Sequence, residues 1–445
     1  MKNNMLKGGI VKSIIIFALP IMASALLQYS YNLIDNIIVG RYISEEALAA
    51  VGCIGPINGF IIGTALGLTG GFTIPVSQKF GAGDKRAMNM YAGSSITLSF
   101  IIGIIIVIIA HIVSNPILKL IRTPENIIEL SSAYINILYF GVPFQMLFNN
   151  FTSICRAVGD SKKPMMFIIV SVITNLVLDI LFVGVFSFGV KGAAAATVIS
   201  YGVAMLFSGI YVFTRQPELS IKKNDLKLNL KISWEQLKLG IPVSLQFTIT
   251  SIGSMILQSA INSFGSTAVA AITAAGKVEQ ITNIPMSALG VANSTFVAQN
   301  YGAGNYKRIV ASVRKILVLD LIICIICSAV LIIAGPYIVR LFIENPSEEI
   351  MGYSKQYLYT IGGCYSLVSL LFVFRNTLQG LGFTYANTIA GAGELVGRLL
   401  VAYCFTKFFG FAAVCFAGPV AWLLADIPLI ILYSKVKKQK LLLQS

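Results

Sequence analysis

Long apolar runs separated by short polar breaks dominate the chain. A helix that crosses a bilayer needs about 20 predominantly apolar residues, and such runs recur from one end of the sequence to the other. No segment shows the strict alternation of apolar and polar positions that is typical of a transmembrane barrel. We therefore expect an all-α polytopic membrane protein with twelve transmembrane helices. They are expected near residues 10–38, 46–76, 87–113, 127–154, 164–186, 191–213, 236–264, 268–298, 309–334, 349–379, 384–408 and 411–434.

The composition restricts the class of protein further. Of the 445 residues, 56% are hydrophobic and only 11% are charged. Soluble domains carry about 25% charged residues because their surface faces water. Disordered chains deviate in the opposite direction, towards few apolar and many charged residues. The composition excludes both classes.

The net charge of +15 carries information about orientation. Of the 33 Lys and Arg residues, 24 lie at the two termini and in the polar breaks on one side of the predicted helices. Basic residues are retained on the cytoplasmic side of a membrane. We therefore expect a multi-pass plasma-membrane protein with both termini in the cytoplasm. Because the basic residues are scattered over many short loops, we expect no nucleic-acid partner.

The chain repeats itself at an offset of 221 to 223 residues. Residues 78–84 (QKFGAGD) match residues 299–305 (QNYGAGN), and Gly159 after the fourth predicted helix matches Gly382 after the tenth. An even number of helices separates the copies, so both have the same orientation, as in transporters built from parallel repeats. We expect an N-terminal six-helix lobe over residues 1–213, a cytoplasmic linker over 214–235 and a C-terminal six-helix lobe over 236–445.

Further short motifs complete the pattern. They are residues 31–41 (YNLIDNIIVGR), 156–160 (RAVGD), 175–179 (NLVLD) and 192–197 (GAAAAT). In this order, and on a twelve-helix repeat, these motifs resemble the multidrug and toxic compound extrusion (MATE) family of secondary transporters. The resemblance covers essentially the full length of the chain.

The resemblance implies a secondary active antiporter and not an enzyme. Such a protein exports amphipathic or cationic drugs and xenobiotics in exchange for Na⁺ or H⁺, by alternating access between two lobes. We expect small-molecule substrates, surrounding membrane lipids, a monomer and no cofactor besides the coupling ion. The alternative is a lipid-linked oligosaccharide flippase of the same wider superfamily. Flippases of that kind have a basic cavity for anionic headgroups, whereas the first lobe of this chain is acidic.

Carboxylates in apolar helices mark the candidate ion site, because charges inside a membrane are costly and usually functional. Asp35 lies on one helical stripe with Gln28 and Tyr31, and Asn175 and Asp179 are four residues apart and share a face. Carboxylate, amide and hydroxyl oxygens suit a small hard cation. The same carboxylates could carry a proton instead.

The resemblance assigns the coupling ion to particular residues of the first lobe. Beyond a Na⁺ at these positions we expect no metal. An alternative is that Asp35 caps a helix or pairs with Arg41. Pro20 can kink the same helix, so we expect ion occupancy to be linked to its bending. The residues assigned to the coupling ion are Asp35, Asn175, Asp179 and Thr197.

Charged residues also occur inside the predicted helices of the second lobe. Glu279 could attract a cationic substrate, or it could equally neutralise Arg398. Glu394 lies four residues before Arg398, and we expect the two to form a structural ion pair. The candidates for substrate contact or cavity lining are Gln28, Tyr31, Tyr201 and Glu279.

The acidic site of the first lobe is missing from the second. NorM-like members of the family carry a Glu in the seventh helix and an Asp in the tenth, and neither is present here. The chain is therefore expected to be nearer the DinF-like and MepA-like branches. The repeat maps Asp35 onto Leu257, Asn175 onto Arg398 and Asp179 onto Ala402.

Overall fold

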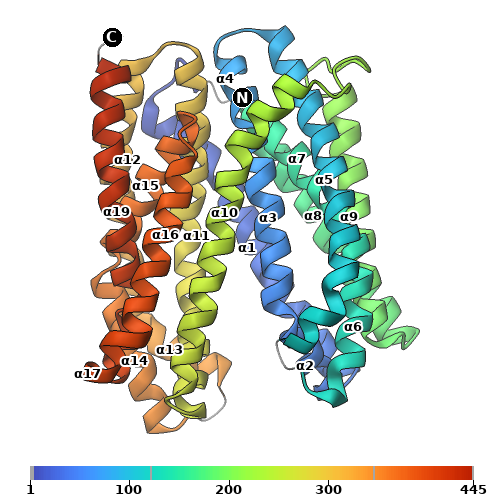
Figure 1. The fold of residues 1–445 in the computed structure, drawn as a ribbon, viewed down its shortest axis with the longest axis vertical. Coiled ribbons are helices and arrows are strands. Elements are labelled where there is room, and N and C mark those ends of the chain that lie inside the picture. The colour runs from blue at the N-terminus through green and yellow to red at the C-terminus, as the bar shows by residue number, and fades with distance from the viewer. Residues whose placement is uncertain (1–4, 121–122, 344–345, 443–445) are drawn as a thin grey trace. The chain divides into compact units, whose positions relative to one another are not determined.

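The computed structural model describes residues 5–120, 123–343 and 346–442. The described part of the chain contains helices and connecting turns, with no strand. It forms two compact units (Figure 1). The first holds residues from Ala23 to Ser244, and the second combines the segment ending at Met22 with the chain from Leu245 onward.

The first unit is built from helices that pack mainly through α3, α5, α7, α8 and α9. Helices α1 and α10 each begin in one unit and end in the other. The elements of this part of the chain are α1 (Ile10–Tyr42), α2 (Glu45–Cys53), α3 (Gly55–Phe72), α4 (Ile74–Gly81), α5 (Lys85–Leu120), α6 (Glu125–Phe140), α7 (Val142–Ala157), α8 (Lys162–Asp179), the π-helix η1 (Ile180–Val185), α9 (Gly189–Thr214) and α10 (Leu230–Asn262).

The second unit has its densest packing where α16 meets α19 and where α11 meets α15. Its core also includes Phe17 from the first part of α1. The elements are α11 (Ser266–Gly302), α12 (Tyr306–Ala329), η2 (Val330–Ala334), α13 (Gly335–Phe342), α14 (Glu348–Gly363), α15 (Ser366–Gly380), α16 (Tyr385–Leu400), η3 (Val401–Phe405), α17 (Thr406–Phe409), α18 (Phe411–Cys415), α19 (Ala417–Val436) and η4 (Lys437–Leu442).

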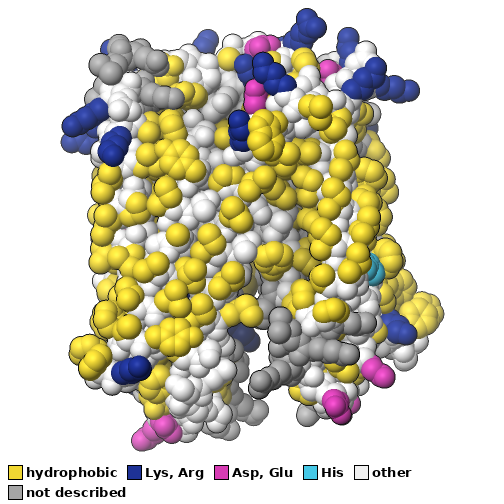
Figure 2. Space-filling model, in the orientation of Figure 1, with side chains coloured by type: hydrophobic (Ala, Val, Ile, Leu, Met, Phe, Trp, Pro, Cys, Tyr) yellow, Lys and Arg dark blue, Asp and Glu magenta, His cyan; other side chains and the backbone are white. Residues whose placement is uncertain are grey.

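The helices confirm the all-α membrane fold. Nine spans in the described part are long and apolar enough to cross a membrane, and two bent pairs, α6 with α7 and α14 with α15, would add two more. Helix α11 occupies the remaining expected span; Lys277, Glu279 and several amides lower its hydropathy. Ile112 on α5 and Ile333 on η2 are 70% and 67% exposed. Figure 2 shows such apolar side chains along the long sides of the helices, as expected of surfaces that face lipid.

The internal repeat recurs in the backbone. Gly83 and Gly304 both have φ of +72°, and Gly159 and Gly382 have φ of +90° and +89°, a left-handed conformation that glycine adopts without steric cost. The bends are also repeated, because α6 and α7 meet at 46° and α14 and α15 at 53°. The π-helices η1 and η3 each follow an equivalent helix, α8 and α16. The two copies therefore share local geometry as well as sequence.

The first half of α10 packs tightly on α3 in the first unit. A Cβ at Gly71 would lie 2.3 Å from the Cα of Gly240, and one at Gly67 would lie 2.5 Å from the Cα of Ser244. Gln236 donates from Nε2 to the carbonyl oxygens of Phe72 and Tyr91 at 3.1 and 2.8 Å. The first unit thus extends through the expected linker and into α10.

Candidate functional site

Helices α1 and α8 bring Asp35 and Asp179 together. Their carboxyl groups lie within hydrogen-bonding reach of each other, so that one can donate to the other when it is protonated. Asp179 is 1% exposed, and within the described part of the chain neither of its oxygens, nor Oδ1 of Asp35, has a hydrogen-bond partner. A buried carboxylate without donors is unfavourable unless a cation or a proton neutralises it. The carboxyl groups of Asp35 and Asp179 are therefore suited to bind a cation or a proton.

The sequence of α8 explains why Asp179 points inward. Ser171, Asn175 and Asp179 are spaced one turn apart and are all buried, because residues at i and i+4 share a helical face. Ile173 and Val177, which lie between them, are 57% and 50% exposed. The apolar face of α8 is suited to lipid, and its polar face is directed into the first unit.

Asn175 and Thr197 add uncharged oxygens beside the pair. Asn175 donates from Nδ2 to Thr197 Oγ1 at 3.4 Å, and Thr197 donates to the carbonyl oxygen of Ala193 at 3.1 Å. The Oδ1 atom of Asn175 is buried and has no hydrogen-bond partner among the described residues. It lies one turn before Asp179 and is available as a ligand oxygen. Such oxygens are the ligands that small hard cations prefer.

Three tyrosines surround the acidic pair. Tyr31 lies near both Asp35 and Thr197. Tyr201 accepts a hydrogen bond from Gln145 Nε2 at 3.3 Å, and Tyr134 lies close to both carboxylates.

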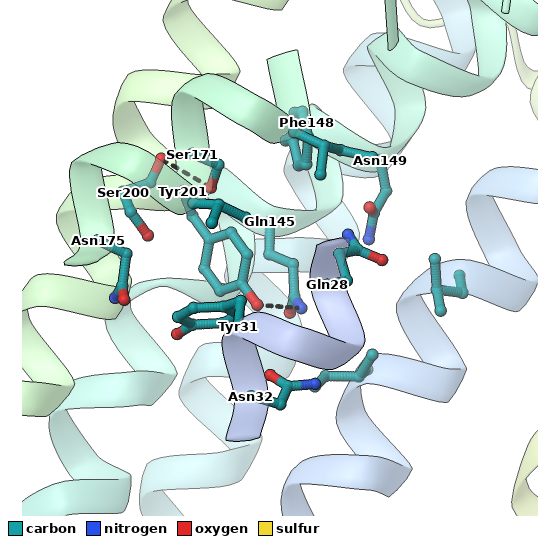
Figure 3. A pocket seen from close by; sticks show the side chains of 14 residues that line it. Gln28, Tyr31, Asn32, Gln145, Phe148, Asn149, Ser171, Asn175, Ser200 and Tyr201 are labelled. Atoms are coloured by element: carbon teal, nitrogen blue, oxygen red, sulfur yellow. Dashed lines mark hydrogen bonds between the residues drawn. The ribbon is translucent and has the colours of Figure 1, made fainter. Parts of the chain in front are cut away.

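A cavity of about 150 Å³ adjoins this cluster inside the first unit (Figure 3). Its lining includes Gln28, Tyr31, Asn175 and Tyr201 but neither carboxylate. Tyr31 and Asn175 each lie one turn before a carboxylate, so the cavity meets the acidic pair through these two residues. A second cavity of about 30 Å³ is lined by Thr197 and Tyr201; one water molecule needs about 10–15 Å³ by this kind of measure.

Most of the site residues that the sequence predicts in the first lobe therefore lie together around Asp35 and Asp179. The helix-cap interpretation of Asp35 does not hold, because α1 continues to Tyr42 and Asp35 lies inside it. The side chain of Arg41 lies outside the described residues. Sequence reasoning missed Tyr134 and Gln145. One signal for Tyr134 was available, since the repeat offset of 223 maps it onto Tyr357.

The charged residues of the second unit form a separate cluster. Glu394 lies between two guanidinium groups, 3.4 Å from Arg398 and 3.5 Å from Arg375. Arg398 also donates to the carbonyl oxygen of Thr250 at 2.9 Å. The predicted ion pair between Glu394 and Arg398 is confirmed, and Arg375 is a second partner of Glu394.

Glu279 has its own hydrogen bonds in the second unit. It accepts from Tyr357 OH at 2.7 Å and from Asn283 Nδ2 at 3.5 Å, and Arg398 is close enough to act on it electrostatically. Glu279 is therefore held in place by Tyr357 and Asn283, with its charge near Arg398.

Comparison with known proteins decides the family. The MatE family model matches the chain twice, over residues 20–181 and again over residues 242–404. The chain belongs to the MATE family. The double match also agrees with the internal repeat, because the two matched segments begin at the repeat offset. This MATE protein is accordingly a multi-pass membrane transporter and not an enzyme.

Full-length relatives of this MATE protein include multidrug transporters. The probable multidrug resistance protein YpnP of Bacillus subtilis (strain 168) is 31% identical over 407 residues, which cover 91% of this chain and 89% of YpnP. The multidrug export protein MepA of Staphylococcus haemolyticus (strain JCSC1435) is 25% identical over 89% of this chain and 84% of MepA. The comparisons thus support drug export and small-molecule substrates, while the branch within the family stays a prediction.

The fold is also that of a solved MATE transporter. A structure described as the outward-facing conformation of a multidrug resistance MATE family transporter of the MOP superfamily matches with a TM-score of 0.90 and 25% identity. The match covers 99% of this chain and 98% of that chain. The two six-helix lobes of the family are therefore present.

Proposed function

We propose that this MATE protein is a secondary active antiporter that exports amphipathic or cationic drugs in exchange for Na⁺ or H⁺. One observation carries the proposal: the carboxyl groups of Asp35 and Asp179 lie side by side, and Asp179 is buried and receives no hydrogen bond within the described residues. Two negative charges in a medium of low dielectric repel each other strongly. A Na⁺ or a proton that enters between them removes that repulsion.

The mechanism follows from the elements that carry the pair. Asp35 is on α1, which contains Pro20, and Asp179 is at the end of α8. Proline removes one backbone hydrogen bond and lets a helix bend. A bound cation favours the arrangement in which α1 and α8 hold both carboxylates together, and its release favours a different position of α1. The ion shifts this equilibrium only by the difference between its affinities for the two states.

The substrate side is proposed from the lining of the larger cavity. Gln28, Tyr31 and Tyr201 line it, and tyrosine faces attract organic cations. A volume of about 150 Å³ is smaller than the roughly 300–1,000 Å³ of pockets for drug-sized ligands. In this conformation the cavity therefore suits an ion with its water, and drug binding requires the cavity to widen during alternating access.

The orientation and cellular location are part of the same proposal. The placement of 24 of the 33 basic residues on one side supports a plasma-membrane protein with both termini in the cytoplasm. The acidic first-lobe site does not favour the flippase alternative, because carboxylates repel an anionic lipid-linked headgroup. We propose that the transporter acts as a monomer.

Transport by purified protein in liposomes tests the proposal. A fluorescent organic cation is loaded on one side, and its export is driven in turn by a sodium gradient and by a pH gradient. We expect export with at least one gradient, and we expect D35N and D179N to abolish it because an amide removes the charge that attracts the ion.

The matched control is D84N. Asp84 is exposed and accepts a hydrogen bond from Ala87 N at 3.0 Å, a role that asparagine retains. Gradient-driven export that persists in both D35N and D179N, with D84N behaving as wild type, would overturn the assignment of the coupling site.

A further inference from the structure

A groove in the second unit combines basic and apolar side chains, none of which belongs to the proposed ion site. It has a volume of about 470 Å³ and lies between α12, α15 and the end of α19, which run side by side in Figure 1. Arg314 on α12 and Lys437 at the start of η4 contribute its positive charge. No acidic side chain lines it.

The two basic groups lack counterions in the described part of the chain. The salt bridges found there join Glu394 to Arg375 and Arg398, and none involves Arg314 or Lys437. Tyr433 and Ser434 line the same groove and bring hydroxyl groups. The polar portion of the groove thus offers two positive charges and hydroxyl donors, the groups that bind a phosphate ester.

The remaining lining is apolar. Leu317 on α12 and Ile430 on α19 lie along it, and Phe374 on α15 packs against the ring of Tyr433 with ring centroids 5.3 Å apart. Phe374 and Tyr433 are 7% and 8% exposed, so they form a fixed floor. A free phosphate would use the basic groups and leave this apolar surface uncovered.

The position of the groove at one end of the membrane helices indicates which ligand it binds. Helix α12 begins at Tyr306 and α19 ends at Val436, so Arg314 and Lys437 mark the same end of two antiparallel membrane helices. Lys315, Lys435 and Lys438 are exposed at this end. Basic pockets between membrane helices near the interface bind anionic headgroups. A phospholipid satisfies both portions of the groove, with its phosphate at the surface and its acyl chain between the helices.

We propose that this groove binds one anionic phospholipid. The phosphate lies between Arg314 and Lys437, and an acyl chain follows Leu317 and Ile430 toward the middle of the membrane. The inference does not depend on the coupling ion or on the drug, because none of these residues belongs to the first unit.

Native mass spectrometry of the detergent-purified full-length protein tests the proposal by titration with dioleoylphosphatidylglycerol. The matched variants are R314Q/K437Q, which neutralises the groove, and K315Q/K438Q, which neutralises the next residue on each helix. A basic residue near an anionic headgroup contributes about 1 kcal/mol. At about 1.4 kcal/mol per tenfold change, we expect R314Q/K437Q to bind about 30-fold more weakly and K315Q/K438Q to bind as wild type does.

Three further binding measurements identify the ligand. Dioleoylphosphatidylcholine should bind weakly and equally to all variants. L317W, which fills the groove and keeps both charges, should also lose phosphatidylglycerol. Inorganic phosphate and glycerophosphoglycerol should fail to displace the lipid.

Equal phosphatidylglycerol binding by R314Q/K437Q and wild type would overturn the proposal. Displacement by the soluble phosphates, or unchanged binding by L317W, would also overturn it and leave an adventitious anion site. Because the readout is binding, a negative result leaves the antiporter proposal untouched.

Discussion

Asp35 and Asp179 are close enough to behave as one titrating unit rather than as two independent acids. A sodium ion between them needs their negative charge, whereas a proton cancels part of it. In the proposed antiport, Na⁺ and H⁺ therefore compete for a single site. We therefore expect the same two residues to serve either gradient, with the ion concentrations on the two sides of the membrane deciding which ion enters.

This competition predicts the pH dependence of sodium binding. Lowering the pH protonates the pair, removes the charge that holds Na⁺ and weakens sodium binding. We expect ²²Na⁺ bound to the purified protein to fall steadily from alkaline to mildly acidic pH, and D179N to bind little at any pH. Sodium binding that is independent of pH in the wild type would show that Na⁺ binds elsewhere.

Several residues of the candidate ion site could be predicted from the sequence because carboxylates are rare in apolar helices. Asp35 and Asp179 are conspicuous in apolar runs, and the one-turn spacing from Asn175 to Asp179 predicts a shared face. Tyr134 could not be recognised in the same way, since tyrosine is ordinary in membrane helices. Its proximity to the carboxylates depends on how α6 packs on α9 and α2, which a linear pattern does not contain.

At the scale of elements, the crossing of α3 and α10 depends on the absence of side chains. Gly71 meets the backbone of Gly240, while nothing lies within 4 Å of a Cβ placed at the adjacent Gly70. We expect G71A to lower stability by about 1–3 kcal/mol through overpacking. G70A should have wild-type or slightly higher stability because alanine favours helix. Thermal unfolding in detergent measures both, and equal effects would contradict the tight crossing.

The charged cluster of the second unit makes a second prediction for elements. Glu394 on α16 is the counterion of Arg375 on α15 and of Arg398 on the same helix. Removing one partner of a buried ion pair leaves uncompensated charge and costs about 3–5 kcal/mol. We expect E394Q to unfold at a clearly lower temperature than wild type, and E348Q, at the exposed start of α14, to have no effect.

The long apolar runs of the sequence predict the membrane-spanning helices and the expected number of twelve. They do not predict the bends between α6 and α7 and between α14 and α15. Gly141 and Cys364, the residues at these breaks, are equivalent in the repeat. Pro143 and Gly363 beside them can mark a break, but they do not determine the angle at which the helices meet. The sequence pattern likewise places the first half of α10 in the second lobe, because its contacts with α3 depend on tertiary packing at Gly67 and Gly71.

At the scale of the whole molecule, duplication has produced two copies with different chemistry. In the first, Asn175 stands one turn before Asp179, whose carboxylate oxygens have no hydrogen-bond partner among the described residues. In the second, the equivalent position is Arg398, a cation that belongs to the chain and already has Glu394 as a partner. A built-in guanidinium needs no exchangeable ion, so a single coupling site in the first copy is sufficient for the proposed antiport.

The difference between the two copies leads to a test of the role of Glu279 in the second copy. Glu279 keeps two hydrogen bonds, from Tyr357 and Asn283, and its carboxylate acts either on a cationic drug or on Arg398. If it acts on the drug, E279Q should weaken export of a monovalent organic cation several-fold. It should leave export of a neutral amphipathic compound and ²²Na⁺ binding unchanged, because glutamine loses the charge but keeps an acceptor oxygen for Asn283 and an amide that can donate to the Tyr357 hydroxyl.

If Glu279 only neutralises Arg398, E279Q should export the cationic and the neutral compound more slowly by the same factor, and its unfolding temperature should fall. E348Q serves as the control for both measurements, since its carboxylate is exposed at a helix start. The ratio of cationic to neutral export is therefore the deciding quantity, because a loss of folded protein lowers both rates and leaves their ratio constant. A ratio that changes while stability does not would place Glu279 on the path of the cationic substrate.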